Sequence, residues 1–341
     1  MKSILEAGNL GGKKVLVRVD WSVPTDSGKV INDYQIRKSL PTIEYLQKAG
    51  ARITLLSHAE KNEDSLLSIY KHAKEFLPRL TFVEPSDLTL LENLRQNAGE
   101  RENSTKFAKE LAELGDIFVN EAFPVSHREH ASIVGLPRLL PSFFGLQFAD
   151  EIKELSRAFY PKRPFLFILG GAKFDTKLPL LGKFINIADE IFVGGALANN
   201  FLKFQGMDVG NSLVDDRDFG LSKLLETKKI ILPEDTIVVD RKIMDAGPIT
   251  MEHLKSKIEA AKLILWNGPL GFYELGYKTA TLQLAKMIVE LGRDSIVGGG
   301  DTLAAIRELD VWDKFSFVST GGGAMLDFLA TGTLPGIEAL K

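Results

Sequence analysis

Short apolar runs alternate with segments of helical periodicity along this chain, and that alternation restricts the possible folds more than any other feature. In the first half the apolar runs cover residues 14–20, 52–57, 88–92 and 116–120. Between the first two runs, apolar side chains recur at helical spacing at Ile36, Leu40, Ile43 and Leu46. Because the predicted strands are nearly all apolar and helices connect them, we expect a parallel sheet with helices on both faces.

The second half repeats this arrangement. Its strand candidates cover residues 165–169, 190–193, 230–232, 236–239, 262–266, 295–297 and 315–318. Between the halves, residues 148–159 have an amphipathic helical pattern that ends in a proline-bracketed basic turn. Since 341 residues exceed one typical domain, the sequence predicts an α/β fold of two doubly wound parallel-sheet (Rossmann-like) domains. We place them at residues 1–150 and 151–325, joined by a hinge helix.

Overall charge and the absence of cysteine exclude several classes of function. The net charge is −3 and the pI is about 6.0, so the field of the whole protein favours neither nucleic acid nor an anionic membrane. The lack of cysteine excludes disulfides, thiol nucleophiles and thiolate metal sites, and it fits a reducing compartment. We therefore expect a cytoplasmic protein that acts on small molecules, with no nucleic-acid or membrane partner.

Glycines follow five strand candidates of the second half. They are Gly170 and Gly171, Gly194 and Gly195, Gly268 and Gly271, Gly298 to Gly300, and Gly321 to Gly323. The carboxyl ends of parallel strands share one edge of a sheet, where a following helix directs free N–H groups at a bound phosphate. A single glycine turn is as well explained by tight packing, but five at one edge favour a phosphate ligand.

The chain lacks two common nucleotide-binding fingerprints, G-x-G-x-x-G after a strand and G-x-x-x-x-G-K-[ST]. Lys173 and Lys177 stand four residues apart after the first glycine turn, and two cations there suit a triphosphate. Asp301 is placed either to bind Mg²⁺ or to cap a helix. Glu274 is either a ribose ligand or a surface acid. These residues favour a nucleotide site in the second domain and a kinase function.

Polar and basic residues lie near the strand ends of the first half. They are Asp20, Ser22, Arg37, His58, Arg95 and Arg128. Arginine binds phosphate or carboxylate through paired hydrogen bonds, so this set predicts a pocket for a small anion. Each of these residues taken singly is more often a surface residue. His127 and His130 lack a third ligand and flank a cation, which argues against a metal there.

Nine stretches of the chain, taken together and in order, resemble the phosphoglycerate kinase family over nearly the whole length. They are VLVRVDWSVP (15–24), LLSH (55–58), LLENLR (90–95), VNEAF with HREHAS (119–132), ILGGAKFDTK (168–177), WNGPLGFYE (266–274), GGGDT (298–302), STGGGA (319–324) and LPGIEAL (334–340). One of these motifs alone is weak, whereas the ordered set is highly specific.

The resemblance implies reversible phosphoryl transfer between ATP and the carboxylate of 3-phosphoglycerate in glycolysis, with Mg²⁺ on the nucleotide. It places 3-phosphoglycerate in the first domain at Asp20, Ser22, Arg37, His58, Lys61, Arg95 and Arg128. It places the nucleotide in the second domain at Gly171, Lys173, Lys177, Gly194, Gly195, Asn267, Pro269, Glu274, Gly300, Asp301 and Thr302, with Asp301 at the metal. It also implies a monomer whose tail, residues 326–341, returns to the first domain.

The implied reaction needs no general base, because the carboxylate of the substrate is already a nucleophile. Catalysis then consists of in-line positioning and neutralisation of charge on the transferring group. The resemblance assigns that role to Arg37, Lys177 and the backbone amides at Gly322 and Gly323. Because the two ligands lie on different domains, we expect a hinge to close the cleft between them and exclude water.

The sequence departs from the family pattern at several positions. Residues 59–62 replace an apolar-Gly-Arg-Pro stretch, so a substrate-binding arginine is missing and Lys61 is at best a point charge in its place. Ser22 replaces an asparagine and Pro124 a glycine. The chain is also shorter than usual, and we expect shortened connections before Leu88 and between residues 240 and 245.

These departures leave two other hypotheses open. The first is a related kinase that acts on another small acyl phosphate or phosphorylated acid. The second is a catalytically silent nucleotide-binding paralogue, against which the retained Lys173, Lys177 and Asp301 argue. An NAD-dependent dehydrogenase is disfavoured because the dinucleotide fingerprint is missing.

Overall fold

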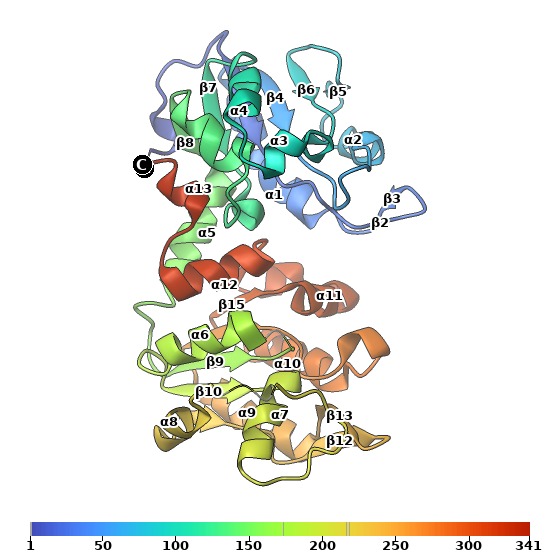
Figure 1. The fold of residues 1–341 in the computed structure, drawn as a ribbon, viewed down its shortest axis with the longest axis vertical. Coiled ribbons are helices and arrows are strands. Elements are labelled where there is room, and N and C mark those ends of the chain that lie inside the picture. The colour runs from blue at the N-terminus through green and yellow to red at the C-terminus, as the bar shows by residue number, and fades with distance from the viewer. Residues whose placement is uncertain (1, 173, 216, 218) are drawn as a thin grey trace. The chain divides into compact units, whose positions relative to one another are not determined.

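The computed structural model describes residues 2–172, 174–215, 217 and 219–341. The chain divides into two compact units: unit 1 consists of Met1–Lys153 and Thr333–Lys341, and unit 2 of Glu154–Gly332. Each unit is built on a six-stranded parallel sheet, which confirms the predicted fold class (Figure 1). None of the helices in the described ranges is long and apolar enough to cross a membrane.

The sheet of unit 1 has the strand order β5-β6-β4-β1-β7-β8. Its strands are β1 (Lys14–Arg18), β4 (Arg52–Leu56), β5 (Thr81–Phe82), β6 (Leu88–Leu90), β7 (Ile117–Asn120) and β8 (Ser142–Phe144). The central strand β1 pairs with β4 and β7, and its Val15, Leu16 and Val17 are buried. The four predicted strands are present, whereas the edge strands β5 and β8 were not predicted because two or three residues carry no periodic signal.

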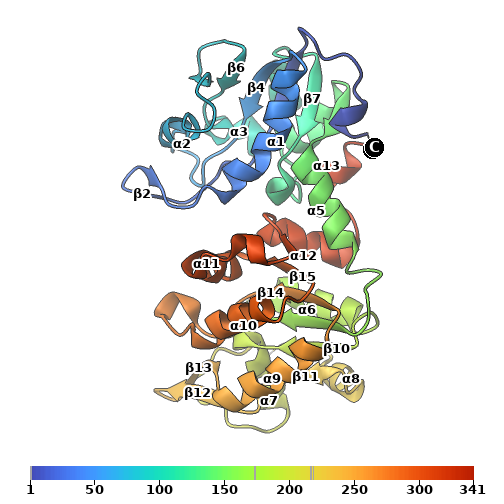
Figure 2. The same ribbon diagram turned by 180° about the vertical axis from the view of Figure 1, so that it is seen from behind.

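Helices cover both faces of this sheet. They are α1 (Tyr34–Lys48), α2 (Leu67–Ala73), α3 (Ala98–Arg101), α4 (Thr105–Ala112) and the C-terminal α13 (Pro335–Glu338). In Figure 1 α4 lies on the near face of the sheet, and in the reverse view of Figure 2 α1 does. The predicted apolar stripe of α1 is buried at Ile36, Ile43 and Leu46. A small hairpin, β2 (Thr25–Asp26) and β3 (Lys29–Val30), follows β1.

The connection between the units is the helix α5 (Leu146–Ser156), which begins in unit 1 and whose last residues belong to unit 2. The tail of the chain returns to unit 1, where the N–H of Gly336 donates to the carbonyl of Ser126 at 2.9 Å. The tail was expected to begin at residue 326. In the structure residues 326–332 belong to unit 2, because α12 (Gly322–Thr331) continues through them.

The sheet of unit 2 has the strand order β11-β10-β9-β14-β15-β16. Its strands are β9 (Phe165–Leu169), β10 (Glu190–Val193), β11 (Ile230–Ile231), β14 (Leu263–Asn267), β15 (Ser295–Gly298) and β16 (Phe317–Val318). Residues 236–239 form a strand, β12 (Thr236–Val239), but it pairs with β13 (Lys242–Ala246) in a separate hairpin. The hairpin was not predicted because its turn uses Asp240 and Arg241 at positive φ instead of glycine or asparagine.

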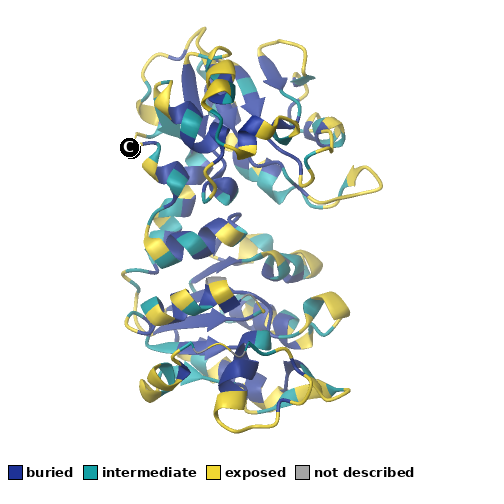
Figure 3. Ribbon diagram, in the orientation of Figure 1, coloured by how far each residue is buried: buried dark blue, intermediate teal, exposed yellow. Residues whose placement is uncertain are grey.

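Seven helices of unit 2 surround its sheet in the described ranges. They are α6 (Phe174–Phe184), α7 (Gly195–Phe204), α8 (Leu221–Glu226), α9 (Pro248–Ala260), α10 (Thr279–Glu290), α11 (Gly300–Leu309) and α12. Figure 3 shows the strands of both sheets buried and the outer faces of many helices exposed. The helices α7, α11 and α12 each begin at a glycine that follows a strand, so their first N–H groups lie at the carboxyl edge of the sheet.

Candidate active site

The carboxyl ends of four strands in unit 1 bring charged and polar side chains together. Asp20 follows β1, His58 follows β4, Arg95 follows β6, and Arg128 lies in the segment after β7. A buried arginine inside β1, Arg18, connects them: its guanidinium Nε donates to Ser132 Oγ at 2.8 Å, and Nη2 lies 3.0 Å from His58 Nδ1. The strand ends therefore form one cluster, which we call the basic cluster (Arg18, His58, Arg95, Arg128 and His130).

Arg18 is balanced by a buried carboxylate. Glu100 lies 3.8 Å from Nη2 of Arg18, accepts a hydrogen bond from Ser132 Oγ at 2.6 Å, and accepts another from the Ser132 backbone N–H at 3.0 Å. Sequence reasoning missed both Arg18 and Glu100. The signal for Arg18 was present, because a single charge inside the apolar run VLVRV has to find a buried partner.

Burial and neighbouring positive charge lower the pKa values of three other members of the basic cluster. Burial lowers the pKa of Arg95 to about 10, and Arg128 and Arg18 add to this shift. Burial, then Arg18 and Arg95, hold the pKa of His58 well below its ordinary value, and similar causes lower the pKa of His130 to about 4. Nε of Arg95 has no hydrogen-bond partner within the described part of the chain. Such a site favours an anion.

Asp20 is the acidic member of the predicted set. Its Oδ1 accepts hydrogen bonds from the Ser22 backbone N–H at 3.1 Å and from the Ser22 hydroxyl, and it lies 3.9 Å from Nδ1 of His58. Ser22 therefore holds the carboxylate of Asp20 in place. A fixed carboxylate among cations can accept a hydrogen bond from a hydroxyl of a bound ligand.

The loop that replaces the family's arginine stretch is held by Asn93. Nδ2 of Asn93 donates to the carbonyls of Lys61, Asn62 and Asp64 at 3.1, 3.0 and 2.8 Å. Oδ1 of the same side chain accepts from the N–H of Ala59 at 3.1 Å. The loop is thus ordered by backbone contacts, while the Lys61 side chain is exposed on it.

Arg37, which was predicted to be catalytic, makes its hydrogen bond and its ring contact away from the basic cluster. Its Nε donates to Asp33 Oδ1 at 2.9 Å, and its guanidinium lies 4.4 Å from the centre of the Phe76 ring. Asp33 in turn lies 3.0 Å from Nε2 of His72. The pairing of Arg37 with Asp33, four residues earlier in the chain, turns the guanidinium toward α2 and the residues that follow it.

Replacing Arg37 with alanine is expected to change kcat by less than about threefold and to lower the free energy of unfolding by at most about 1 kcal/mol, as for other exposed ion pairs. Steady-state kinetics and chemical denaturation measure the two quantities. A loss of kcat of two orders of magnitude would instead support the predicted catalytic role of Arg37.

In unit 2 the glycine turns pack against one another. The N–H of Gly170 donates to the Asn267 carbonyl at 2.9 Å, and that of Gly171 to the Pro269 carbonyl at 2.8 Å. A Cβ on Gly170 would lie 2.1 Å from the Pro269 carbonyl oxygen, and a Cβ on Gly195 2.5 Å from the Gly171 nitrogen. Tight packing therefore accounts for these two glycines, as it does for the neighbouring Gly194, which is buried.

The glycines at the starts of α11 and α12 have different surroundings. A Cβ on Gly300 or on Gly322 would meet no atom within 4 Å, and Gly323 is exposed. Open space beside the first N–H groups of a helix leaves those groups accessible to a phosphate. The two helix starts are therefore the places in this edge where a nucleotide could meet free backbone donors.

Lys177 lies among the glycine turns. It is buried on α6, its Nζ donates to the Gly170 carbonyl, and a Cβ on Gly268 would lie 2.4 Å from that Nζ. An ammonium group so close to two backbone turns adds positive charge where phosphate oxygens are expected. Lys173, which was predicted to act beside it, lies outside the described residues.

The other predicted nucleotide ligands differ in accessibility. Thr302 is buried, and its hydroxyl accepts a hydrogen bond from the Gly268 N–H at 2.9 Å. Asn267 is buried with its amide 3.8 Å from Sδ of Met325. Glu274 is exposed in the short helix Tyr273–Leu275. Thr302 and Asn267 thus support the loops, and Glu274 alone of these three presents its side chain to solvent.

Asp301 lies in the first turn of α11, next to the open Gly300. In the ranges that the structure describes, no hydrogen bond or ion pair involves its carboxylate. No cluster of three or more metal-binding side chains is present in those ranges either. One carboxylate beside an open helix start suits Mg²⁺, which binds through one or two carboxylates together with phosphates and water.

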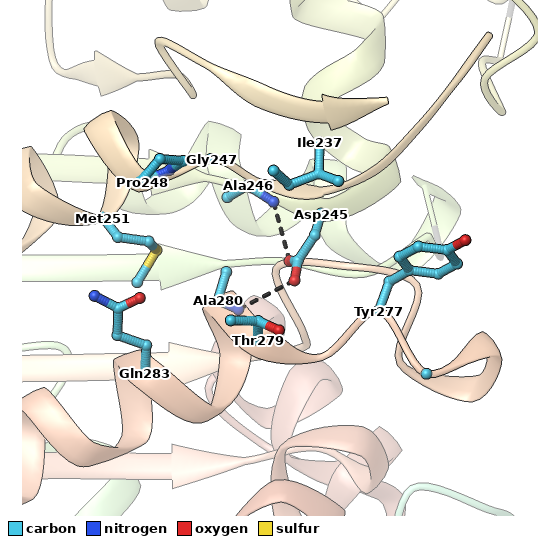
Figure 4. A pocket seen from close by; sticks show the side chains of 11 residues that line it. Ile237, Asp245, Ala246, Gly247, Pro248, Met251, Tyr277, Thr279, Ala280 and Gln283 are labelled. Atoms are coloured by element: carbon cyan, nitrogen blue, oxygen red, sulfur yellow. Dashed lines mark hydrogen bonds between the residues drawn. The ribbon is translucent and has the colours of Figure 1, made fainter. Parts of the chain in front are cut away.

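A separate cavity of about 330 Å³ lies beside β13, between the starts of α9 and α10 (Figure 4). Asp245 forms part of its wall and accepts hydrogen bonds from the N–H groups of Ala246 and Ala280 at 3.0 and 3.1 Å. Burial raises the pKa of Asp245. The residues that line this cavity include none of the predicted ligands.

The chain is similar to known proteins over its whole length. The family model described as phosphoglycerate kinase matches residues 5–332. The phosphoglycerate kinase of Coprothermobacter proteolyticus is 36% identical over 388 aligned positions, which cover 100% of this chain and 98% of that protein. That of Thermosipho africanus is 39% identical, with 97% and 96% covered. Because 388 aligned positions exceed the 341 residues here, the chain lacks segments that the first relative has.

Solved structures agree with these matches. The phosphoglycerate kinase from Coxiella burnetii superposes with a TM-score of 0.84 at 35% identity, covering 99% of this chain and 98% of that one. The enzyme from Pyrococcus horikoshii superposes with a TM-score of 0.87 at 28% identity, covering 100% and 98%.

Proposed function

Because the chain belongs to the phosphoglycerate kinase family, we propose that its basic cluster binds 3-phosphoglycerate and that the carboxyl edge of the unit 2 sheet binds the nucleotide. Family membership makes the chain a glycolytic phosphotransferase with a carboxyl group as acceptor. The observation that carries the site assignment is the grouping of His58, Arg95 and Arg128 around Arg18 at one sheet edge.

The residues of each unit are chemically suited to the ligand proposed for them. Arg95 and Arg128 supply guanidinium groups that can hold the carboxylate or phosphate of the acid, and Asp20 can accept a hydrogen bond from its hydroxyl. Lys177 and the N–H groups at Gly322 and Gly323 provide positive charge for the transferring phosphoryl group. The substrate carboxylate attacks directly, so no side chain has to remove a proton. The two sets lie on different units, and in-line transfer requires the two bound ligands to come together.

Asp301 is the proposed protein ligand of Mg²⁺, and Gly300 leaves room for the phosphates beside it. When bound, the metal would neutralise phosphate charge during transfer. Lys177 and the helix starts would still orient the nucleotide. We also infer a cytoplasmic monomer, in keeping with a glycolytic role and a chain without cysteine.

Replacing Asp301 with asparagine is expected to raise the Mg²⁺ concentration for half-maximal activity about tenfold, since the neutral amide is a weaker ligand for a hard cation. Magnesium titrations at fixed ATP measure this shift. Glu308 on the same helix, which pairs with Lys278, is the control: Glu308→Gln is expected to leave the magnesium requirement unchanged. Equal magnesium curves for the wild type and Asp301→Asn would contradict the assignment.

A kinase for another small acid is the second candidate, favoured by the loop at residues 59–64, where an exposed Lys61 stands in place of an arginine. Hydroxylamine trapping separates the two, because it converts any acyl phosphate into a measurable hydroxamate. A panel of 3-phosphoglycerate, unphosphorylated glycerate and short carboxylic acids tests which acid is phosphorylated. We expect 3-phosphoglycerate to give the highest kcat/KM of the panel. A higher kcat/KM for an acid without phosphate would overturn the assignment of 3-phosphoglycerate as the substrate.

A further inference from the structure

Glu121 is a buried carboxylate next to the proposed acid site that the mechanism above does not use. It follows β7 directly, and each hydrogen-bond partner of its carboxylate oxygens in the described part of the chain is a donor. Oε1 accepts from the Thr42 hydroxyl and from the Gln147 N–H at 3.1 Å, and Oε2 accepts from the Phe148 N–H at 3.1 Å. An ionised carboxylate, which only accepts, matches this set of donors.

These contacts cap the first turn of α5. The N–H groups at a helix start lack partners within the helix, and here the first bond inside it runs from Ala149 to the Gly145 carbonyl at 3.1 Å. Thr42 Oγ accepts from the Leu146 N–H at 2.9 Å, so its own hydrogen is available for Glu121. Glu121 and Thr42 together therefore satisfy three N–H groups of the turn, those of Leu146, Gln147 and Phe148.

The same residue is fixed to the basic cluster through its backbone. The N–H of Glu121 donates to the Arg18 carbonyl at 2.8 Å, and the segment that carries Arg128 begins at this point of the chain. The N–H of Gly145 donates to the Asn120 carbonyl at 3.0 Å. Glu121 thus joins three parts of unit 1: the end of β7, the helix α1 through Thr42, and the start of α5.

Gly145 is what permits this close approach. A Cβ there would lie 2.1 Å from Oε2 of Glu121, well inside the distance that real Cβ atoms show. Any larger residue would displace the carboxylate from the helix start. The cap can therefore be disturbed by replacing either Glu121 or Gly145.

We infer that Glu121 is a positioning residue for the kinase reaction, which holds the segment with Arg128 in place by capping α5, the helix that leads into unit 2. This inference rests on the proposed function, because it takes the basic cluster as the acid site. Loss of the cap is expected to weaken binding of the acid on unit 1 and to leave binding of the nucleotide on unit 2 unchanged.

The ionisation of Glu121 adds a second readout. Burial raises its pKa to about 7, against the hydrogen bonds from Thr42, Phe148 and Gln147, and Asp150 on α5 acts in the same direction as burial. Below that pH the group gains a proton, and the oxygen that carries it becomes a donor that faces another donor, so its hydrogen bond to the helix start is weakened. The cap is therefore complete above about pH 7 and is weakened as the pH falls through that value.

The test compares Glu121→Gln with Asp235→Asn in the full chain, with 3-phosphoglycerate and ATP as variable substrates. Asp235 is a matched control in unit 2, since it caps α9 through the N–H groups of Ile249 and Thr250 and the Thr250 hydroxyl. Glu121→Gln is expected to raise the KM for 3-phosphoglycerate about five- to tenfold, the effect of one unsatisfied buried donor, with the KM for ATP unchanged. Asp235→Asn is expected to change neither KM.

Gly145→Ala provides a second test, because it keeps the Glu121 carboxylate but displaces it from the helix start. We expect the KM for 3-phosphoglycerate to rise and the KM for ATP to stay unchanged. The pH profile is a third test. Between pH 8 and 6 the KM for 3-phosphoglycerate is expected to rise in the wild type and in Asp235→Asn alike, but less in Glu121→Gln. Equal KM values and equal pH profiles in all proteins would overturn the inference. Absence of wild-type turnover would instead contradict the proposed function.

Discussion

Replacing Lys177 with alanine is expected to lower kcat by about 10²- to 10³-fold, the loss seen when one charge-stabilising donor is removed from a transition state. Lys177 is buried between the turns at Gly170 and Gly268, so its ammonium is held where phosphate charge is expected. The KM for ATP is expected to change by less than about threefold, because an interaction made mainly in the transition state affects kcat more than ground-state binding.

The contact between Lys177 and the Gly170 carbonyl also permits a purely structural role. Circular dichroism and thermal unfolding of Lys177→Ala separate the two roles, and Lys177→Arg tests whether charge alone suffices. Lys183, on the same helix, donates to the Ala330 carbonyl at 3.0 Å, so Lys183→Ala controls for loss of a lysine that bonds a backbone oxygen. A folded Lys177→Ala enzyme with unchanged kcat would remove Lys177 from the transition state.

Replacing Arg95 with methionine is expected to raise the KM for 3-phosphoglycerate about 10²-fold, the loss associated with removing one member of a partly buried charge pair. The protein is expected to unfold at the same temperature or higher. Arg95 is partly buried beside Arg128 and Arg18, and its pKa is lowered to about 10, so its charge opposes folding. Its bonds to the Ala59 and Glu60 carbonyls, at 3.3 and 3.4 Å, are long and contribute little.

Kinetics with varied 3-phosphoglycerate and a thermal melt without ligand measure these two effects. Arg52→Met is the control, since Arg52 is exposed in unit 1 and has a weak ion pair with Asp87 at 3.8 Å. It is expected to alter neither KM nor melting temperature. A marked loss of stability in Arg95→Met with an unchanged KM would show that Arg95 supports the loop at residues 59–64 and does not bind substrate.

The sequence predicted the sheets well because their central strands are apolar runs bounded by clear turns. Residues 14–20 and 165–169 both contain strands that are buried on both faces, β1 and β9. Features that depend on tertiary pairing were not predictable. The edge strand β5 has two residues, and the hairpin of β12 and β13 turns at Asp240 and Arg241, where glycine or asparagine is usual.

Predicted site residues lie together in the structure where a strand end alone decides their position. His58 and Arg95 follow strands, and the parallel sheet brings them together around Arg18. Arg37 lies on a helix, where the side of the helix that carries a residue decides its partners. Its side chain contacts Asp33 and Phe76. Glu100 and Glu121 could not be identified from the sequence, because a buried carboxylate is recognised by distant donors such as Ser132 and Thr42.

Initial rates with Mg-ATP and 3-phosphoglycerate measure whether this chain transfers a phosphoryl group from ATP to 3-phosphoglycerate. The product, 1,3-bisphosphoglycerate, is measured through a coupled reduction that oxidises NADH. Turnover of about 1–100 s⁻¹, typical of kinases, is expected, and it should depend on both substrates. ATP consumption that is no faster with 3-phosphoglycerate than without it would contradict the proposed function.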